Sequence, residues 1–99
     1  MKLIAEQPYT KIERQVKSIE QVDVEHHRTM YLYDEKVVTQ HHEFPIRDVF
    51  DMSYRFIGGQ GGLLYLHTSR GVFPYTVKSS PEQFVAAFKE FTEQWRTRQ

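Results

Sequence analysis

Residues 80–96, SPEQFVAAFKEFTEQWR, decide the fold because they form the clearest helical segment of the chain. Ser80 precedes a proline at the first helical position, and Gln83 follows three residues after the serine, a pattern typical of a helix start. Large rings then recur at helical spacing along one face, at Phe84, Phe88, Phe91 and Trp95. The sequence therefore predicts an amphipathic helix over residues 81–96 that covers an apolar core.

Residues 22–78 carry short runs rich in Val, Ile, Tyr, Phe and Thr between turn residues, which is typical of meandering antiparallel strands. Residues 29–33 and 36–40 are expected to form a hairpin, and residues 48–56 alternate as a half-buried strand. Two further strands are expected at 63–68 and 72–77, joined by a turn in which Gly71 suits a positive φ. Pro74 cannot donate to a ladder, so its strand is expected at a sheet edge or with a bulge.

Residues 1–21 fit two kinds of structure. Apolar side chains at Tyr9, Ile12, Val16 and Ile19 lie at helical spacing, and Glu13 with Lys17 forms an i, i+4 pair. Residues 11–16 also alternate as a strand does. The prediction favours a helix over residues 11–20, with a strand as the alternative.

Length and composition indicate one small domain over residues 1–99. The chain has 13 basic and 13 acidic residues, and this balance argues against nucleic acid and against a charge-driven membrane contact. Cysteine is absent, which excludes disulfides and Cys-ligated zinc. The apolar run in the first residues, MKLIAEQPY, is too short for the apolar region of a signal peptide. No run reaches the ~20 apolar residues of a membrane helix. A cytoplasmic protein is expected.

Four stretches together resemble the pleckstrin-homology-like (PH-like) domains of small bacterial proteins. They are a hairpin YLYDEKVVTQ (31–40), a proline step FPIRDVFDMS (44–53), a strand pair LYLHTSRGVFPYTV (64–77) and a closing helix SSPEQFVAAFKEF (79–91). The resemblance implies an α+β fold in which two bent, nearly orthogonal antiparallel sheets form a partly open barrel capped by the C-terminal helix. A helix at residues 11–20 would be an addition to this pattern, which usually begins with strands.

Histidines suggest a metal site as one alternative. Residues 26–43, HHRTMYLYDEKVVTQHHE, contain four of the five histidines. A two-residue turn at Asp34 and Glu35 would set His27 opposite His42, whereas a three-residue loop would set Arg28 opposite His42, and both registers stay open. Neighbouring histidines in a strand point to opposite faces, and zinc needs at least three protein ligands, so polar strand ends are the competing interpretation. His67, alone in an apolar strand, is expected to be partly exposed or hydrogen bonded.

The glycine-rich stretch at residues 58–62, GGQGG, lacks the Lys and Ser/Thr of a phosphate-binding loop and precedes a strand. It is expected to be a hairpin loop that a partner could order. The basic side chains at Lys11, Arg14, Lys17 and Arg28 are interleaved with acidic ones, so phosphoinositide binding is not expected.

No grouping of Ser, His and Asp marks an active site, and no cofactor is implied. The sequence therefore predicts a non-enzymatic interaction module that binds another protein or self-associates. The residues expected at the partner surface are Gly59, Gln60, Gly61, Pro74 and Trp95. Two alternatives stay open, a metal-binding protein or metal-dependent enzyme that uses His27 and His42, and small-ligand or lipid binding at the mouth of the barrel.

Overall fold

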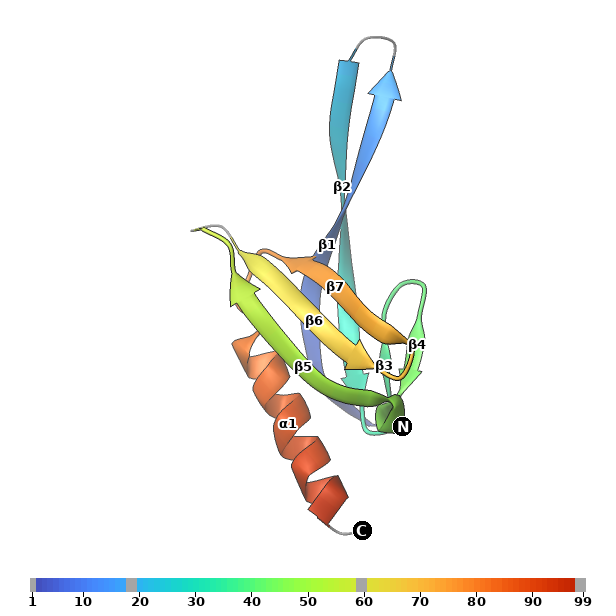
Figure 1. Cartoon of the computed structure of the whole chain (residues 1–99), viewed down its shortest axis with the longest axis vertical. Coiled ribbons are helices and arrows are strands. Elements are labelled where there is room, and N and C mark those ends of the chain that lie inside the picture. The colour runs from blue at the N-terminus through green and yellow to red at the C-terminus, as the bar shows by residue number, and fades with distance from the viewer. Residues whose placement is uncertain (1, 18–19, 59–60, 98–99) are drawn as a thin grey trace.

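The computed structural model describes residues 2–17, 20–58 and 61–97, with backbone alone at residues 17 and 95–97. Seven strands, one short 3-10 helix and one α-helix follow one another along the chain (Figure 1). In order they are β1 (Leu3–Lys17), β2 (Glu20–Tyr33), β3 (Lys36–Val38), β4 (Glu43–Pro45), η1 (Ile46–Asp48), β5 (Val49–Phe56), β6 (Gly62–Thr68), β7 (Gly71–Val77) and α1 (Glu82–Thr97).

The strands form one antiparallel sheet in the order β4-β3-β2-β1-β7-β6-β5. The two outermost strands, β4 and β5, are consecutive in the chain and are joined only by η1, so the sheet must curl to bring its edges together. Ring contacts confirm the curl, because Phe44 of β4 lies 5.0 Å from Phe73 of β7, centroid to centroid. The expected pair of separate sheets is therefore corrected to one continuous, curled sheet.

Residues 11–17 do not form the helix that the sequence favoured over residues 11–20, and residues 18 and 19 of that prediction lie outside the described residues. Residues 11–17 belong to β1, which pairs with β2 from Ala5↔Leu32 to Lys17↔Glu20. Ile12 and Val16, which the helical pattern placed on an apolar face, are 51% and 67% exposed. The helical spacing of Ile12 and Val16 therefore did not mark a buried helix face. The alternation of polar and apolar residues over 11–16 was the pattern that indicated the strand.

The core lies inside the curl and is closed by α1. The helix contacts β5 and β1, and its Phe84, Val85 and Phe88 are buried with strand residues such as Met52 and Leu64. The predicted helix is confirmed, and its start is supported by Ser80, whose hydroxyl accepts from the Glu82 amide at 3.3 Å. Figure 1 shows α1 at the end of the molecule away from the tip of the β1-β2 hairpin.

A bulge in β5 changes which residues face the core. The β5-β6 register shifts between Val49↔Thr68 and Asp51↔His67, so Phe50 is the extra residue and is 55% exposed. Val49 and Met52 are both fully buried although they are three positions apart, an odd spacing that puts side chains of a regular strand on opposite faces. Side-chain parity along the strand is therefore reset at Phe50, as expected of a bulge.

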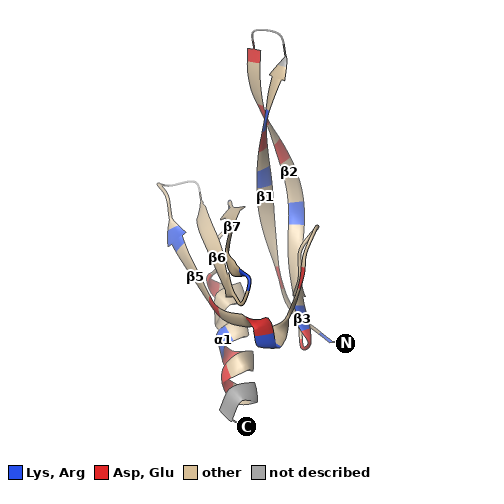
Figure 2. Ribbon diagram, turned by 45° about the vertical axis from the view of Figure 1, so that its right-hand side comes forward, with Lys and Arg blue, Asp and Glu red and all other residues tan. Residues whose placement is uncertain are grey.

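The β1-β2 hairpin extends well beyond the rest of the sheet. β1 meets β7 in the ladder at Thr10↔Thr76 alone, and β2 meets β3 only at Tyr31 and Leu32. Residues 11–17 and 20–26, here called the arm, are therefore a two-stranded ribbon, and they give the molecule its 58 Å length (Figures 1 and 2).

Candidate functional site

A groove of about 340 Å³ opens at the root of the arm, where β1 and β7 diverge beyond Thr10↔Thr76. Three segments line it, residues 9–12 of β1, residues 73–76 of β7, and the β3-β4 loop at Thr39, His41 and His42, together with Arg28 of β2. The groove lies between β1, β7 and the β3-β4 loop of the curled sheet. Binding of a small ligand or lipid there stays a prediction.

Two tyrosines form the floor of this groove. Tyr9 is buried and meets Tyr75 edge to face, with ring centroids 5.1 Å apart. The Tyr9 hydroxyl accepts from the Gln40 amide at 3.0 Å, so its own hydrogen is available for donation. Burial raises the pKa of Tyr75, partly offset by a hydrogen bond with Thr39, so this phenol is neutral and a donor at pH 7. The floor combines aromatic faces with hydroxyl groups.

The charged side chains that line the groove are Lys11 and Arg28, both basic, and His41 and His42 lie beside them. Among the described residues, no Asp or Glu lines the groove. Nearby acids have partners, because Glu13 lies 3.1 Å from His26 and Glu25 lies 2.5 Å from Lys78. Figure 2 shows the bands of both charges along the arm. The groove therefore favours a negatively charged group.

The histidines proposed as metal ligands do not come together as the sequence suggested. Of the two registers that the sequence left open, the structure has the two-residue turn at Asp34 and Glu35, because Leu32 pairs with Val37. However, β3 ends at Val38, and the Thr39 amide donates to the His42 carbonyl at 2.8 Å, which turns the chain away from β2. His27 instead pairs with Thr10 on β1.

His42 stacks on Phe44 with ring centroids 5.5 Å apart and planes 7° apart. Among the residues that the structure describes, no three His, Asp or Glu side chains are grouped as a metal site would require. Metal binding by His27 and His42 therefore stays a prediction without a third ligand in the described part of the chain.

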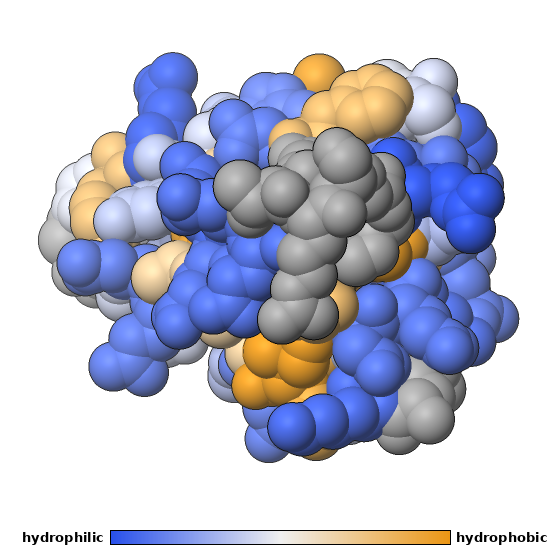
Figure 3. All heavy atoms as spheres, turned by 90° about the horizontal axis from the view of Figure 1, so that it is seen from below, coloured by the Kyte–Doolittle hydropathy of each residue, from blue (hydrophilic) through white to orange (hydrophobic). Residues whose placement is uncertain are grey.

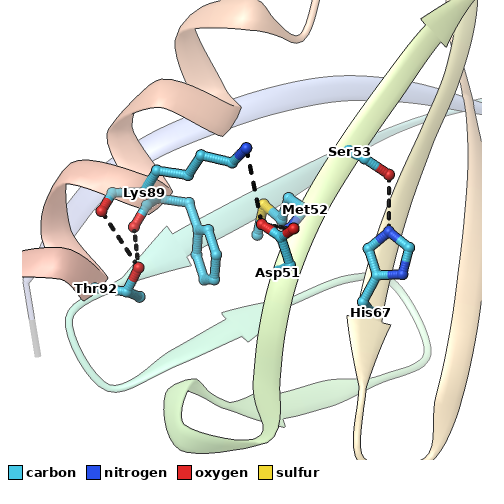
Figure 4. Close-up of polar contacts among 7 residues, drawn as sticks. Asp51, Met52, Ser53, His67, Lys89 and Thr92 are labelled. Atoms are coloured by element: carbon cyan, nitrogen blue, oxygen red, sulfur yellow. Dashed lines mark hydrogen bonds and ion pairs between the residues drawn. The ribbon is translucent and has the colours of Figure 1, made fainter. Parts of the chain in front are cut away.

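Ser53 and His67 form a contact that the sequence did not single out. Ser53 Oγ lies 2.7 Å from His67 Nε2 across β5 and β6 (Figure 4). This confirms that His67 is half-buried and hydrogen bonded. Within the described residues, His67 is in no ion pair with a carboxylate, and neither Ser53 nor His67 lines the groove. The pair therefore supports a polar contact between two strands.

Pro74 lies in β7, which is paired along its whole length on one side and at a single residue on the other. β7 pairs with β6 at every residue, whereas its other side meets β1 at Thr76 alone. The predicted edge position of this strand is wrong, because β7 lies between β1 and β6. The stretch around Pro74 is nevertheless unpaired on the β1 side, where it lines the groove.

The other residues predicted at a partner surface are placed only in part. Gly59 and Gln60 lie outside the described residues, and so does the side chain of Trp95. Gly61 is half-buried, and its carbonyl accepts from the Ile57 amide at 2.9 Å. A Cβ there would lie 2.3 Å from the Val77 carbonyl oxygen, so Gly61 is required by the turn.

A second hollow of about 510 Å³ separates α1 from the start of β1. Its lining mixes acidic and basic side chains with Leu3 and Phe91. Figure 3 views the molecule from this end and shows a mainly hydrophilic surface with small apolar areas. With no dominant charge or shape, this hollow is a weaker candidate than the groove.

The sequence missed Tyr9 and Tyr75 as groove residues because their proximity depends on where β1 and β7 meet. Lys11 and Arg28 were considered only within a mixed charged surface. The alternation of residues 11–16 was the available signal, since a strand at that position places residues 9 and 11 on one face.

Comparison with known protein families, with curated proteins and with solved structures finds no match. Among the helices of the described residues, none is both long and apolar enough to cross a membrane.

Proposed function

We propose that this chain is a non-enzymatic interaction module, and that the arm is the part that engages another protein or a second copy of the chain. The observation that carries the proposal is a two-stranded ribbon that leaves the sheet beyond Thr10↔Thr76. A hairpin alone in water is at best marginally stable, because it has no third element on which to bury a face. A partner would supply that element.

Exposed apolar side chains on the arm support this role. Ile12, Val16 and Val22 are 51%, 67% and 43% exposed. Ile12 and Val16 share one face of the ribbon, because alternate residues of a strand point the same way, and Val22 pairs with Gln15 on the other face. A docked partner would remove this apolar surface from water, which stabilises a complex by about 25 cal/mol per Å².

The proposed scaffold is PH-like. Support comes from a curled antiparallel sheet whose two ends are joined through η1, followed by a C-terminal helix that buries Phe84 and Phe88 in the core. In this proposal the body provides a rigid base, and the arm and the adjoining groove provide the contact surface.

Sedimentation velocity and a pull-down from cell extract test the proposal with matched variants. Ile12→Thr/Val16→Thr keeps β-branched residues in β1 while removing exposed apolar surface. Val72→Thr makes the same kind of change at a residue that is 56% exposed on β7, away from the arm. We expect the arm variant, but not the control, to lose the partner or the self-association. A chain that is monomeric and captures nothing through the arm would contradict the proposal.

A further inference from the structure

The outer edge of β1 is a free backbone edge beside the groove. Residues 11–17 are paired with β2 on one side, and β7 has already diverged on the other. Seven extended residues span about 23 Å, enough for a strand of ordinary length to pair there. On the facing side of the groove, Pro74 has no amide hydrogen to donate, so β1 offers the more complete edge.

The charge beside this edge is positive. Residues 11–17, KIERQVK, contain three basic residues and one acidic residue. One of each is paired across the arm, Glu13 with His26 and Arg14 with Asp23, so the remaining charges of this segment are basic. Lys11 and Arg28 line the groove, and neither is in an ion pair within the described part of the chain. An added strand that carries carboxylates would gain attraction there, whereas a basic strand would be repelled.

The same charges disfavour a second copy as the occupant. Two antiparallel β1 edges centred on Arg14 would oppose Lys11 to Lys17 and Arg14 to Arg14. Two of the three acidic residues of β2 are already paired within the chain, since Asp23 lies 3.5 Å from Arg14 and Glu25 lies 2.5 Å from Lys78, and the third, Glu20, lies at the far end of the arm. A foreign acidic segment fits the edge better than this chain does.

Resting on the proposed role of the arm, we propose that the β1 edge and the groove bind an extended acidic segment of another protein, added as a strand beside β1. A carboxylate of the segment lies near Lys11 and Arg28. Two residues from this carboxylate, an apolar side chain of the same segment lies on the same face and contacts the rings of Phe73 and Tyr75. Backbone pairing supplies a sequence-independent part of the affinity, and the charges select acidic segments.

Fluorescence anisotropy with labelled eight-residue peptides tests this on the full chain. A peptide that alternates Glu and Val is expected to bind, and its Gln/Val counterpart to bind about tenfold more weakly, since about 1.4 kcal/mol corresponds to tenfold. A Glu/Val peptide with N-methylated backbone amides keeps the charge but cannot pair with β1. We expect this peptide to bind at least tenfold more weakly than the unmodified Glu/Val peptide.

Matched variants locate the site. The double variant Lys11→Gln/Arg28→Gln is expected to bind the Glu/Val peptide about tenfold more weakly, which corresponds to about 0.7 kcal/mol for each lost charge pair. Arg47→Gln/Arg55→Gln changes the net charge equally at exposed residues that do not line the groove, and is expected to leave binding within about twofold. Thermal melts of both variants check that they fold.

Three results would overturn the inference. They are no binding of the Glu/Val peptide by the wild-type chain, equal binding of the Gln/Val or N-methylated peptide, and equal losses in the two double variants. If a partner is still captured through Ile12 and Val16 but the acidic peptide does not bind, the proposed function of the arm stands and only the acidic strand is rejected. If sedimentation shows that a second copy occupies the edge, the inference also fails.

Discussion

Lys78 Nζ lies 2.5 Å from Glu25 Oε1, so the residue that follows β7 is tied to β2 at the arm, 53 positions earlier in the chain. The Lys78 hydrogen bond, and then its charge, lower the pKa of Glu25 below its usual value. Both side chains are substantially exposed, so water and salt screen the pair and its effect on global stability is small. We infer that its main effect is on the position of the arm relative to β7.

Lys78→Met is expected to return the pKa of Glu25 toward its usual value. Because the folded-state pKa is the lower one, the ion pair contributes stability above the ordinary pKa of glutamate and loses it as the pH falls through the lowered pKa. NMR titration of the Glu25 carboxyl carbon measures this directly. Lys89→Met is the control, since Lys89 lies 3.8 Å from Asp51 instead (Figure 4). An unchanged Glu25 pKa in Lys78→Met would refute the pairing.

Phe88→Ala is expected to lower the free energy of unfolding by about 3–5 kcal/mol, because it removes a large buried ring and leaves a cavity between α1 and the sheet. Phe56→Ala makes the same chemical change at a ring that is 57% exposed, and is expected to cost about 1 kcal/mol or less. Urea unfolding measures both. Similar losses in the two variants would show that α1 does not close the core.

Gly61→Ala is expected to destabilise the chain more than Gly58→Ala. Both glycines have positive φ, +123° and +69°, but only a Cβ at Gly61 would meet backbone, with the Val77 oxygen at 2.3 Å. Gly58→Ala is expected to cost about 1–2 kcal/mol from the left-handed backbone alone. Gly61→Ala adds about 1–3 kcal/mol for strain. Equal thermal shifts in the two variants would contradict the close approach of Gly61 to Val77.

Amide hydrogens of the arm are expected to exchange with solvent faster than those of β6. β6 is paired on both sides, with β5 and with β7, and its Leu64 and Leu66 are fully buried. Arm residues have one partner strand each, and Ile12 and Val16 are exposed. Exchange mass spectrometry on dilute protein compares the two segments. Arm protection equal to that of β6 would mean that another chain already covers the ribbon, which the same experiment at several concentrations would reveal.

Local sequence was sufficient to predict the C-terminal helix and most of the strands. The rings of Phe84 and Phe88 recur at helical spacing and are buried where that pattern placed them. Gly71 has the positive φ that its turn required, and the predicted hairpin around Asp34 and Glu35 is present. In these segments the side-chain pattern and the local backbone preference agree, so neighbouring residues carry the needed information.

Tertiary structure alone decided the arm and the groove. Ile12 and Val16 fit both a helical spacing and the alternation of a strand, and these local patterns do not decide between the two. Backbone pairing with β2 holds both residues in a strand. The groove exists because β1 and β7, far apart in sequence, meet at Thr10↔Thr76 and then diverge. Likewise, Phe44 meets Phe73 only because η1 joins the two ends of the sheet and makes it curl. Such contacts depend on strand order and register, which are set by the packing of the whole chain.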